Sequence, residues 1–460
     1  MKNVAIEEVI KEAAHYVELR AQKNTTQMVG LINGDLMSNS ETVASGVSAR
    51  SFINGEWAMA ASSVISKDSL WGVLEKSKRN AEFLSKIKST PANTKIVEKE
   101  FQFERDYQGS TQVLTQKDLI DKARDINSYI EKKYPDLKRV DVIINYNELE
   151  KKLMASNGSS AYHTLPRTVF YVSLSYEKDG EIVSLLNGLG GYGRTFDVMD
   201  GHEKFYPEIE KTYQQVREKA SGIMPSAGVK DVIVSPAVTG VLAHEAVGHP
   251  AEADLVRAGS VAGVNLGKEV ASSLVTMVDF AHSYNGKELP VPVYIDDEGV
   301  EAVDSVLIDQ GTLVNYMHNR ESSSHFDMAP TGNARAFTYT DEPLIRMRNT
   351  IILPGQDKLD DMISSIDDGY HLLSRSNGQA DLTTEFMFGV TFGYEIKKGK
   401  LGRAIKDTTI SGVAFNMLKT VDMVSDEFSV HSTGFCGKKQ RMIVSHGGPS
   451  LKCKVHIGGK

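Results

Sequence analysis

The sequence predicts an α+β protein made of two halves, with helices and mainly antiparallel β-sheet. Segments with apolar residues at helical spacing concentrate in the first half, and short apolar runs separated by Gly and Asn turns dominate the second. The composition, 41% hydrophobic and 24% charged over 460 residues, is that of a folded globular chain. We expect an N-terminal α+β domain at 1–222 and a C-terminal, mainly antiparallel β domain at 223–460.

Charge and composition exclude several classes of protein. The formal net charge of −8 argues against a nonspecific nucleic-acid binder, which needs a basic surface. No apolar run approaches the roughly 18 residues needed to cross a membrane, and the first 20 residues carry too many charges for a secretory signal. Two cysteines make no disulfide framework, so we predict a cytoplasmic protein with no membrane or nucleic-acid partner.

The first half begins with a predicted surface helix at 4–23. Two Asn-Gly pairs follow, at 33–34 and 54–55, and each predicts a β-hairpin because both central turn residues need positive φ. Helical spacing returns at 67–86 and 116–133, and the stretch 140–186 is typical of strands. A polar helical segment at 205–221 then bridges the two halves.

A glycine cluster at 188–193 matches the G-x-G-x-x-G pattern of dinucleotide sites. In such sites the loop opens a helix whose backbone amides bind a pyrophosphate. The residues that follow have no amphipathic helical pattern. We therefore interpret the cluster as a glycine-rich bend between strands.

The second half opens with a strand and then a helix, in "KDVIVSPAVTGVLAHEAVGH". Beyond residue 290 the pattern is mostly that of strands, in "VPVYIDDEG", "SVLIDQGTLVNYM", "NTIILPG", "FMFGVTFGYEIKKGKL" and "RMIVSHGG". Close spacing and Gly or Asn turns favour antiparallel pairing over βαβ crossovers.

A candidate metal site lies in the helix of that opening segment. His244, Glu245 and His249 combine two imidazoles with a carboxylate. Zinc binds neutral imidazole and acidifies a bound water, and a nearby carboxylate can accept the proton during attack on a carbonyl. The alternative is two structural histidines on a helix.

The spacing of the two histidines requires a distorted helix. They lie five residues apart, which is roughly 140° around a regular α-helix and too far for one ion. We expect a helix that starts near Pro236, with Ser235 as its N-cap, and widens as a π-bulge or unwinds near Gly248. Pro250 should also bias His249 away from the α region.

A catalytic zinc site needs a third protein ligand. Cys436 lies between two glycines in "TGFCGKKQ", where the backbone can approach closely, and zinc readily accepts a thiolate. An inert buried thiol is the alternative. Cys453, in "LKCKVHI", fits a packing position in a strand.

These blocks together resemble the TldD/PmbA family, cytoplasmic metallopeptidases once described as modulators of DNA gyrase. The resemblance spans nearly the whole chain and is carried by "GVSARSFINGEWAMAAS", "HEAVGHPAEAD", "DDEGVEA", "LIDQGTLVNYM", "TGNARA", "RMRNTIILPG" and "GFCGKKQ". The H-E-x-x-x-H and G-x-C-G-K blocks match the TldD type, which binds metal, and not the catalytically silent TldE (PmbA) type. Pro250 departs from the family pattern, which has glycine there.

The resemblance implies a zinc peptidase that cleaves small or unfolded peptides in a site enclosed between two subunits. It implies zinc ligands His244, His249 and Cys436, with Glu245 as general base. Glu252 and Asp254 match the same block, and either could orient a histidine or be an ordinary solvated acid.

Less direct expectations also follow from the resemblance. Candidate substrate contacts are Tyr316, His318, Asn333 and Arg335, which could equally serve in loops and turns. The expected assembly is a homodimer or a heterodimer with a TldE/PmbA-like paralogue. A silent binding or adaptor subunit is the alternative function, and the net charge opposes a DNA- or gyrase-binding regulator.

Overall fold

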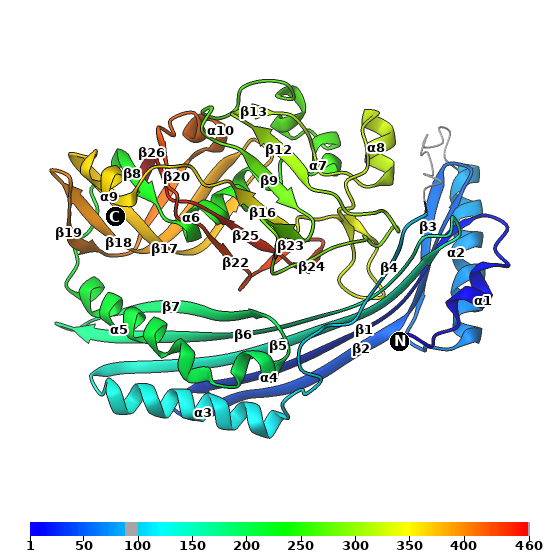
Figure 1. Ribbon diagram of the computed structural model, residues 1–460, viewed down its shortest axis with the longest axis horizontal. Coiled ribbons are helices and arrows are strands. Elements are labelled where there is room, and N and C mark those ends of the chain that lie inside the picture. The colour runs from blue at the N-terminus through cyan, green and yellow to red at the C-terminus, as the bar shows by residue number, and fades with distance from the viewer. Residues whose placement is uncertain (88–99, 459–460) are drawn as a thin grey trace.

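A long, curved seven-stranded sheet forms the base of the molecule, and the second half of the chain lies above it (Figure 1). The protein is described by a computed structural model over residues 1–87 and 100–458. The α+β class and the dominance of antiparallel pairing, both predicted from the sequence, are confirmed.

The base sheet has the strand order β3-β2-β1-β5-β6-β4, with β7 paired to β6. All its pairings are antiparallel except β4–β6. Its strands are β1 (Tyr16–Ile32), β2 (Asp35–Ile53), β3 (Glu56–Ser62), β4 (Gln102–Arg105), β5 (Leu137–Ala155), β6 (Ser160–Lys178) and β7 (Glu181–Tyr192).

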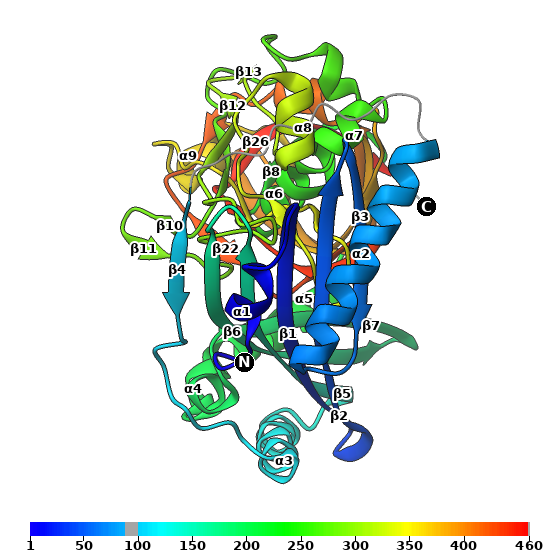
Figure 2. The same ribbon diagram turned by 90° about the vertical axis from the view of Figure 1, so that its right-hand side faces the viewer.

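Helices cover this sheet near both ends. The helices α1 (Ile6–Ile10) and α2 (Lys67–Ile87) pack near β1, β2 and β3 (Figure 2). At the other end α3 (Gln116–Lys133) packs on β5 and α5 (Tyr206–Ala220) on β6 and β7, beside the short α4 (Thr195–Met199) and the 3-10 turn η1 (His202–Phe205). The predicted helices at 67–86, 116–133 and 205–221 are therefore confirmed.

The second half contains two larger sheets. One has the order β17-β8-β26-β20-β18-β19, with β21 on β26, and the other the order β13-β12-β9-β16-β25-β22. Their strands are β8 (Gly228–Val234), β9 (Met277–Phe280), β12 (Ser305–Asp309), β13 (Thr312–Leu313), β16 (Asn349–Ile352), β17 (Asp368–Ala380), β18 (Glu385–Lys397), β19 (Lys400–Ile405), β20 (Thr408–Val413), β21 (Met423–Val424), β22 (Ser429–His431), β25 (Ser445–Gly448) and β26 (Leu451–Gly458).

Short helices and two-stranded ribbons complete this half. The helices are α6 (Pro236–Val241), the π-helix η2 (Leu242–Gly248), α7 (Ala253–Arg257), η3 (Val261–Val264), α8 (Arg320–Phe326), α9 (Leu359–Ser364) and α10 (Ala414–Leu418). The ribbons pair β10 (Ser283–Tyr284) with β11 (Lys287–Glu288), β14 (Ala334–Arg335) with β15 (Leu344–Ile345), and β23 (Phe435–Lys438) with β24 (Gln440–Ile443). The domain limits 1–222 and 223–460 remain a proposal.

Both predicted Asn-Gly hairpins are confirmed. Asn33 and Gly34 join β1 to β2 with φ of 47° and 79°, and Asn54 and Gly55 join β2 to β3 with φ of 49° and 84°. Positive φ at both central positions matches the right-handed twist of the paired strands.

Three local predictions are wrong. The helix expected at 4–23 ends at Ile10, and β1 begins at Tyr16. The glycines at 188–191 lie within β7 and do not form a bend between strands, while Gly193 precedes the five-residue α4. The stretch "VPVYIDDEG" is mostly irregular, because the Asp296 carboxylate accepts from the backbone N–H groups of Glu298 and Val300 and closes a turn.

The two faces of β1 explain why this segment is a strand. Val17, Leu19 and Ala21 point into the apolar core under α1 and α2. Residues between them face the second half: Arg20 donates to Asp341 O at 2.7 Å and Gln22 to Phe337 O at 2.6 Å. This alternation has the period of two that a strand requires.

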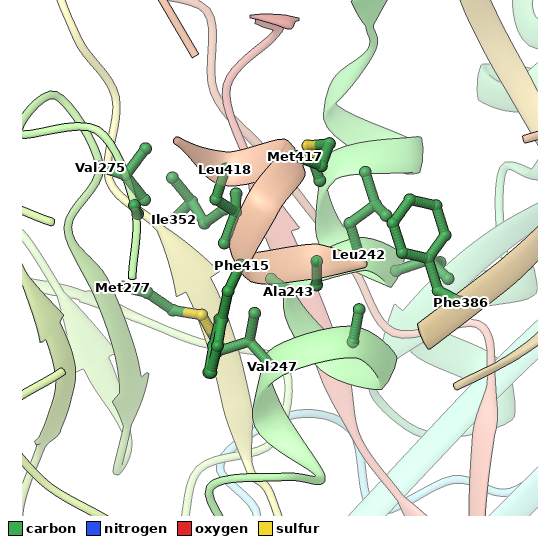
Figure 3. Packing of buried hydrophobic residues seen from close by; sticks show 14 of the residues in the cluster. Leu242, Ala243, Val247, Val275, Met277, Ile352, Phe386, Phe415, Met417 and Leu418 are labelled. Carbon is green, nitrogen blue, oxygen red and sulfur yellow. The ribbon is translucent and has the colours of Figure 1, made fainter. Parts of the chain in front are cut away.

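The core of the second half surrounds the π-helix (Figure 3). Leu242, Ala243 and Val247 of η2 pack with Phe415 of α10 and with residues from neighbouring strands. Burial of this apolar face fixes the rotation of the helix, so the polar residues between these positions occupy its other side.

Candidate metal centre

The helix that carries both candidate histidines widens into a π-helix, as the spacing predicted. A regular α6 passes into η2 at Leu242. The His249 N–H donates to His244 O at 3.1 Å, an i→i−5 bond that adds one residue to the turn. The extra residue brings the two imidazole ring centres to 5.1 Å from each other.

Gly248 permits the close packing that accompanies this turn. A Cβ atom at Gly248 would lie 2.2 Å from the Met347 Sδ and 3.1 Å from Ala243 O. A side chain at this position would therefore force the buried Met347 side chain to move and would crowd the helix backbone at Ala243. This is a steric reason for glycine directly before His249.

Two local predictions about this helix need correction. Pro250 does not move His249 out of the α region, since His249 has φ −59° and ψ −49°. The π-turn already adds the extra residue between the two histidines, so His249 can keep helical backbone dihedral angles. Ser235 occupies the N-cap position with Pro236 after it, but its hydroxyl donates to Leu373 O at 2.8 Å and caps no helix N–H.

The structure brings Cys436 to the two histidines. One donor atom from each of His244, His249 and Cys436 lies within 4.8 Å of the others. The Cys436 Sγ is 3.1 Å from His249 Nε2, although the two residues are 187 positions apart. Antiparallel pairing of β23 with β24 places Cys436 opposite Met442 and holds the thiol in this position.

The residues fit a transition-metal ion. Within the described chain neither ring nitrogen of His244 has a hydrogen-bond partner, although the side chain is only 3% exposed. Leaving a buried polar group unpaired costs about 1–3 kcal/mol, and a metal bond to that nitrogen would remove the cost. Two imidazoles and a thiolate form a donor set that zinc accepts.

The two histidines differ in charge state. Burial and the nearby charges of His249 and His446 hold the pKa of His244 well below its usual value, so this imidazole is neutral, as a metal ligand must be. Burial opposes protonation of His249 as well, but the Glu252 carboxylate and Cys436 raise its pKa to about 10. A metal would therefore displace a proton from His249.

Glu245 has the exposure and basicity expected of a general base. Its side chain is 31% exposed and its Oε2 lies 3.7 Å from His249 Nε2. Burial raises the pKa of the Glu245 carboxyl, against the opposing charges of His249 and Arg375. A carboxylate with a raised pKa accepts a proton more readily near neutral pH.

A partly buried lysine links the histidine segment to the cysteine strand. Glu252, fully buried, lies 3.1 Å from His249 Nδ1. The Lys438 ammonium lies 2.9 Å from the Glu252 carboxylate and 2.9 Å from that of Asp254. Partners of this kind orient metal ligands. Lys438 was not among the residues predicted from the sequence, although it stands two residues after Cys436 in the same block.

All four predicted substrate contacts are buried and make side-chain hydrogen bonds within the second half. Tyr316 donates to Ala262 O at 3.1 Å, His318 pairs with the Ser322 hydroxyl at 3.1 Å, and Asn333 donates to Asp279 Oδ2 at 2.8 Å. None of these three side chains is more than 1% exposed, so each one is packed and hydrogen-bonded in the interior of the protein. Arg335 lines a cleft with Lys151 and Tyr192, but its guanidinium donates to Met347 O and Ile443 O at 2.6 and 2.9 Å.

The fold and the donor set define an α+β protein with a largely buried His–His–Cys cluster suited to a transition metal. The family model "PmbA/TldA metallopeptidase C-terminal domain" matches residues 227–459, and "PmbA/TldA metallopeptidase domain 1" matches residues 17–81. The chain belongs to the TldD/PmbA family of metallopeptidases.

Curated relatives are named as metalloproteases. A zinc metalloprotease TldD homologue of Saccharolobus solfataricus is 30% identical over 74% of this chain and 79% of its own. A metalloprotease of Methanocaldococcus jannaschii is 28% identical over 98% of this chain and 99% of its own. These names support a metalloprotease family, and the first supports zinc as its metal.

Solved structures share the fold at low sequence identity. TldE of Thermococcus kodakarensis aligns with a TM-score of 0.75 at 16% identity, covering 99% of each chain. A Thermotoga maritima protein titled a putative modulator of a DNA gyrase aligns with a TM-score of 0.76 at 17% identity, covering 98% of each chain. Among the helices of the described residues, none combines the length and the apolar character needed to span a membrane.

Proposed function

We propose that this protein is a zinc-dependent peptidase in which His244, His249 and Cys436 hold the ion and Glu245 is the general base. The observation that carries the proposal is the buried, unpaired His244 imidazole beside two further donors and a partly exposed carboxylate. When bound, zinc would supply a Lewis acid that polarises a peptide carbonyl and makes a water acidic.

The chain's own residues would handle the proton. Glu245 is ionised above its raised pKa and can take a proton from the attacking water, then deliver it to the departing amine. Glu252 is placed to accept from His249 Nδ1–H, which would leave Nε2 as the nitrogen available to hold the ion. Small or unfolded peptides are the substrates we propose, because the family relatives are metalloproteases and two of the three donors, His244 and Cys436, are buried.

A second subunit belongs to the same proposal. The structural similarity to TldE supports assembly with a TldE-like paralogue or with a second copy of this chain. Hydrodynamic measurement on the purified protein, alone and with a paralogue from the same source, tests the assembly.

The direct test compares Glu245→Gln with the wild type on an unfolded protein substrate. We expect one zinc per chain in both, digestion by the wild type that a chelator stops, and a fall in kcat of at least about 100-fold in the variant. Glu269→Gln, an exposed acid outside the cluster, is the matched control and should digest normally. Wild-type protein that binds zinc but cleaves nothing would instead favour the silent adaptor function.

A further inference from the structure

Among the described residues, one arginine on a strand that packs on η2 has no acidic partner within ion-pair distance. Arg375 lies on β17, and among the described residues its guanidinium makes one hydrogen bond, to His446 Nε2 at 3.1 Å. The side chain is only partly exposed. A guanidinium has five N–H donors, so most of these donors remain free for another acceptor.

Local irregularity in β17 sets the direction of Arg375. The register between β17 and β18 shifts at Leu372/Ser374, at Ser374/Arg375 and again at Arg375/Gly378. Bulges of this kind redirect side chains and are common beside active sites. The strand runs alongside α6 and η2, the helices that carry the candidate metal ligands.

His446 contacts both the Arg375 guanidinium and the helix α6. Its ring centre lies 6.1 Å from that of His244, and its side chain is only 6% exposed. A Cβ at Gly240 of α6 would lie 2.5 Å from His446 Nδ1, so glycine allows the imidazole to pack directly on the helix. His446 therefore connects the Arg375 guanidinium to α6.

Arg375 places a positive charge one imidazole away from the candidate ligand His244. Its Nη2 donates to His446 Nε2 at 3.1 Å, and the His446 ring centre is 6.1 Å from that of His244. The strand β17 that carries Arg375 also packs on η2, the helix of His244 and Glu245. The free donors of the guanidinium are therefore close to the candidate site.

We propose that Arg375 is a catalytic residue that donates a hydrogen bond to the oxygen of the scissile carbonyl as negative charge develops there. This inference rests on the proposed peptidase function. The water oxygen forms a bond to the carbonyl carbon, and the C=O π pair moves onto the oxygen beside Arg375. That pair returns as the C–N bond breaks, and the proton held by Glu245 goes to the amine. One water yields one carboxylate and one amine.

Substitution of Arg375 should lower kcat more than it changes KM. Loss of one donor to a developing oxyanion costs roughly 100- to 1,000-fold in kcat. We therefore expect Arg375→Met to lose about 100-fold or more in kcat, with KM changed by less than about threefold. Arg375→Lys should be intermediate, because it keeps the charge but loses the planar donor fork. Arg403→Met is the matched control, since Arg403 is 66% exposed and bound to Glu395 at 2.9 Å.

A binding measurement separates transition-state contact from a structural role. A phosphinic peptide carries a tetrahedral, negatively charged centre in place of the scissile carbonyl. Calorimetry should show that Arg375→Met weakens binding of the phosphinic peptide by about 100-fold. The matching substrate peptide is tested in the Glu245→Gln background. There, adding Arg375→Met should change the affinity for this peptide by less than about threefold. Zinc content should stay at one per chain.

Three results would overturn the assignment. They are a zinc-loaded Arg375→Met enzyme with kcat within about threefold of wild type, an equal loss of affinity for both peptides, and loss of zinc from the variant. If Arg375→Met does not fold, Arg375→Lys carries the test, with at least a tenfold fall in kcat expected and wild-type kcat contradicting it. Failure of the proposed function is distinguishable, because the wild type itself would then be inactive.

Discussion

Cys436 and Cys453 are both buried, yet their surroundings give them different chemistry. Burial raises the pKa of the Cys453 thiol to about 12, and Cys453 packs in β26 among apolar residues, as the sequence predicted. Cys436 instead faces the His249 ring at 3.1 Å. The sequence could not choose between them from spacing, because 187 residues separate Cys436 from His249; the resemblance to the family pointed to Cys436.

Replacement of Cys436 should weaken zinc binding. A serine hydroxyl is a poorer zinc ligand than a thiolate, so we expect Cys436→Ser to lose at least about 100-fold in zinc affinity. Competition with a chromogenic chelator measures this loss. Cys453→Ala is the control and should keep zinc affinity within about threefold while losing roughly 1 kcal/mol of stability. Equal zinc affinity in Cys436→Ser and wild type would remove this residue from the site.

At the scale of the element, the widened turn depends on Gly248. We expect Gly248→Ala to destabilise the protein by about 1–3 kcal/mol, because its Cβ would lie 2.2 Å from Met347 Sδ in a packed core. Chemical denaturation measures the change. At Gly72 in α2, a Cβ would meet nothing within 4 Å, and Gly72→Ala should stabilise by about 0.5–1 kcal/mol. Equal effects in the two variants would show that the π-turn does not need glycine.

Elements that depend on local chemistry could be predicted, and those that depend on distant partners could not. The Asn-Gly turns and the helix at 116–133 contain their own signals, positive φ and a capping box from Thr115 to Asp118. The apolar residues of the segment 4–23 are compatible with both the helical and the strand period. Its outcome is decided by Arg20 and Gln22, which bind residues more than 300 positions away.

Another prediction at this scale concerns His371 of β17. The side chain is 5% exposed, and burial lowers its pKa to about 4. The unfolded chain has a His pKa near 6.5, so the stabilisation is complete above pH 6.5 and is lost as the pH falls towards 4. Between pH 7.5 and 5 the loss is about 2 kcal/mol.

Denaturation of the metal-free protein measures this pH dependence. His371→Gln should flatten the curve by about that amount, since glutamine does not titrate. The wild type and variant differ only in this group, so the titration of the candidate ligands cancels. Parallel curves for the two proteins would contradict the assignment.

At the scale of the whole molecule, buried ion pairs join the base sheet to the second half. The Arg50 guanidinium on β2 lies 2.6 Å from Glu298 and 3.3 Å from Glu18. Lys151 on β5 lies 2.6 Å from Asp297. All are at most 5% exposed. No spacing rule reveals such pairs, because each partner sits on a strand or turn whose position is set by the other half. The same contacts hold the second half, with the candidate metal centre, on the sheet.

Loss of Arg50 should therefore cost far more than loss of an exposed arginine on the same sheet. Arg50→Met leaves two buried carboxylates without their cation, and we expect about 3–5 kcal/mol of destabilisation at pH 8. Arg139→Met removes a solvent-exposed pair with Asp141 and should leave the stability nearly unchanged. Burial already raises the pKa of Glu18 to about 7 while Arg50 opposes the rise. Without Arg50 that carboxyl should protonate at still higher pH, so the deficit of Arg50→Met should shrink as the pH is lowered from 8 to 6. Thermal unfolding at both pH values measures this. A deficit that matches that of Arg139→Met, or that grows on acidification, would mean that these ion pairs do not hold the two halves together.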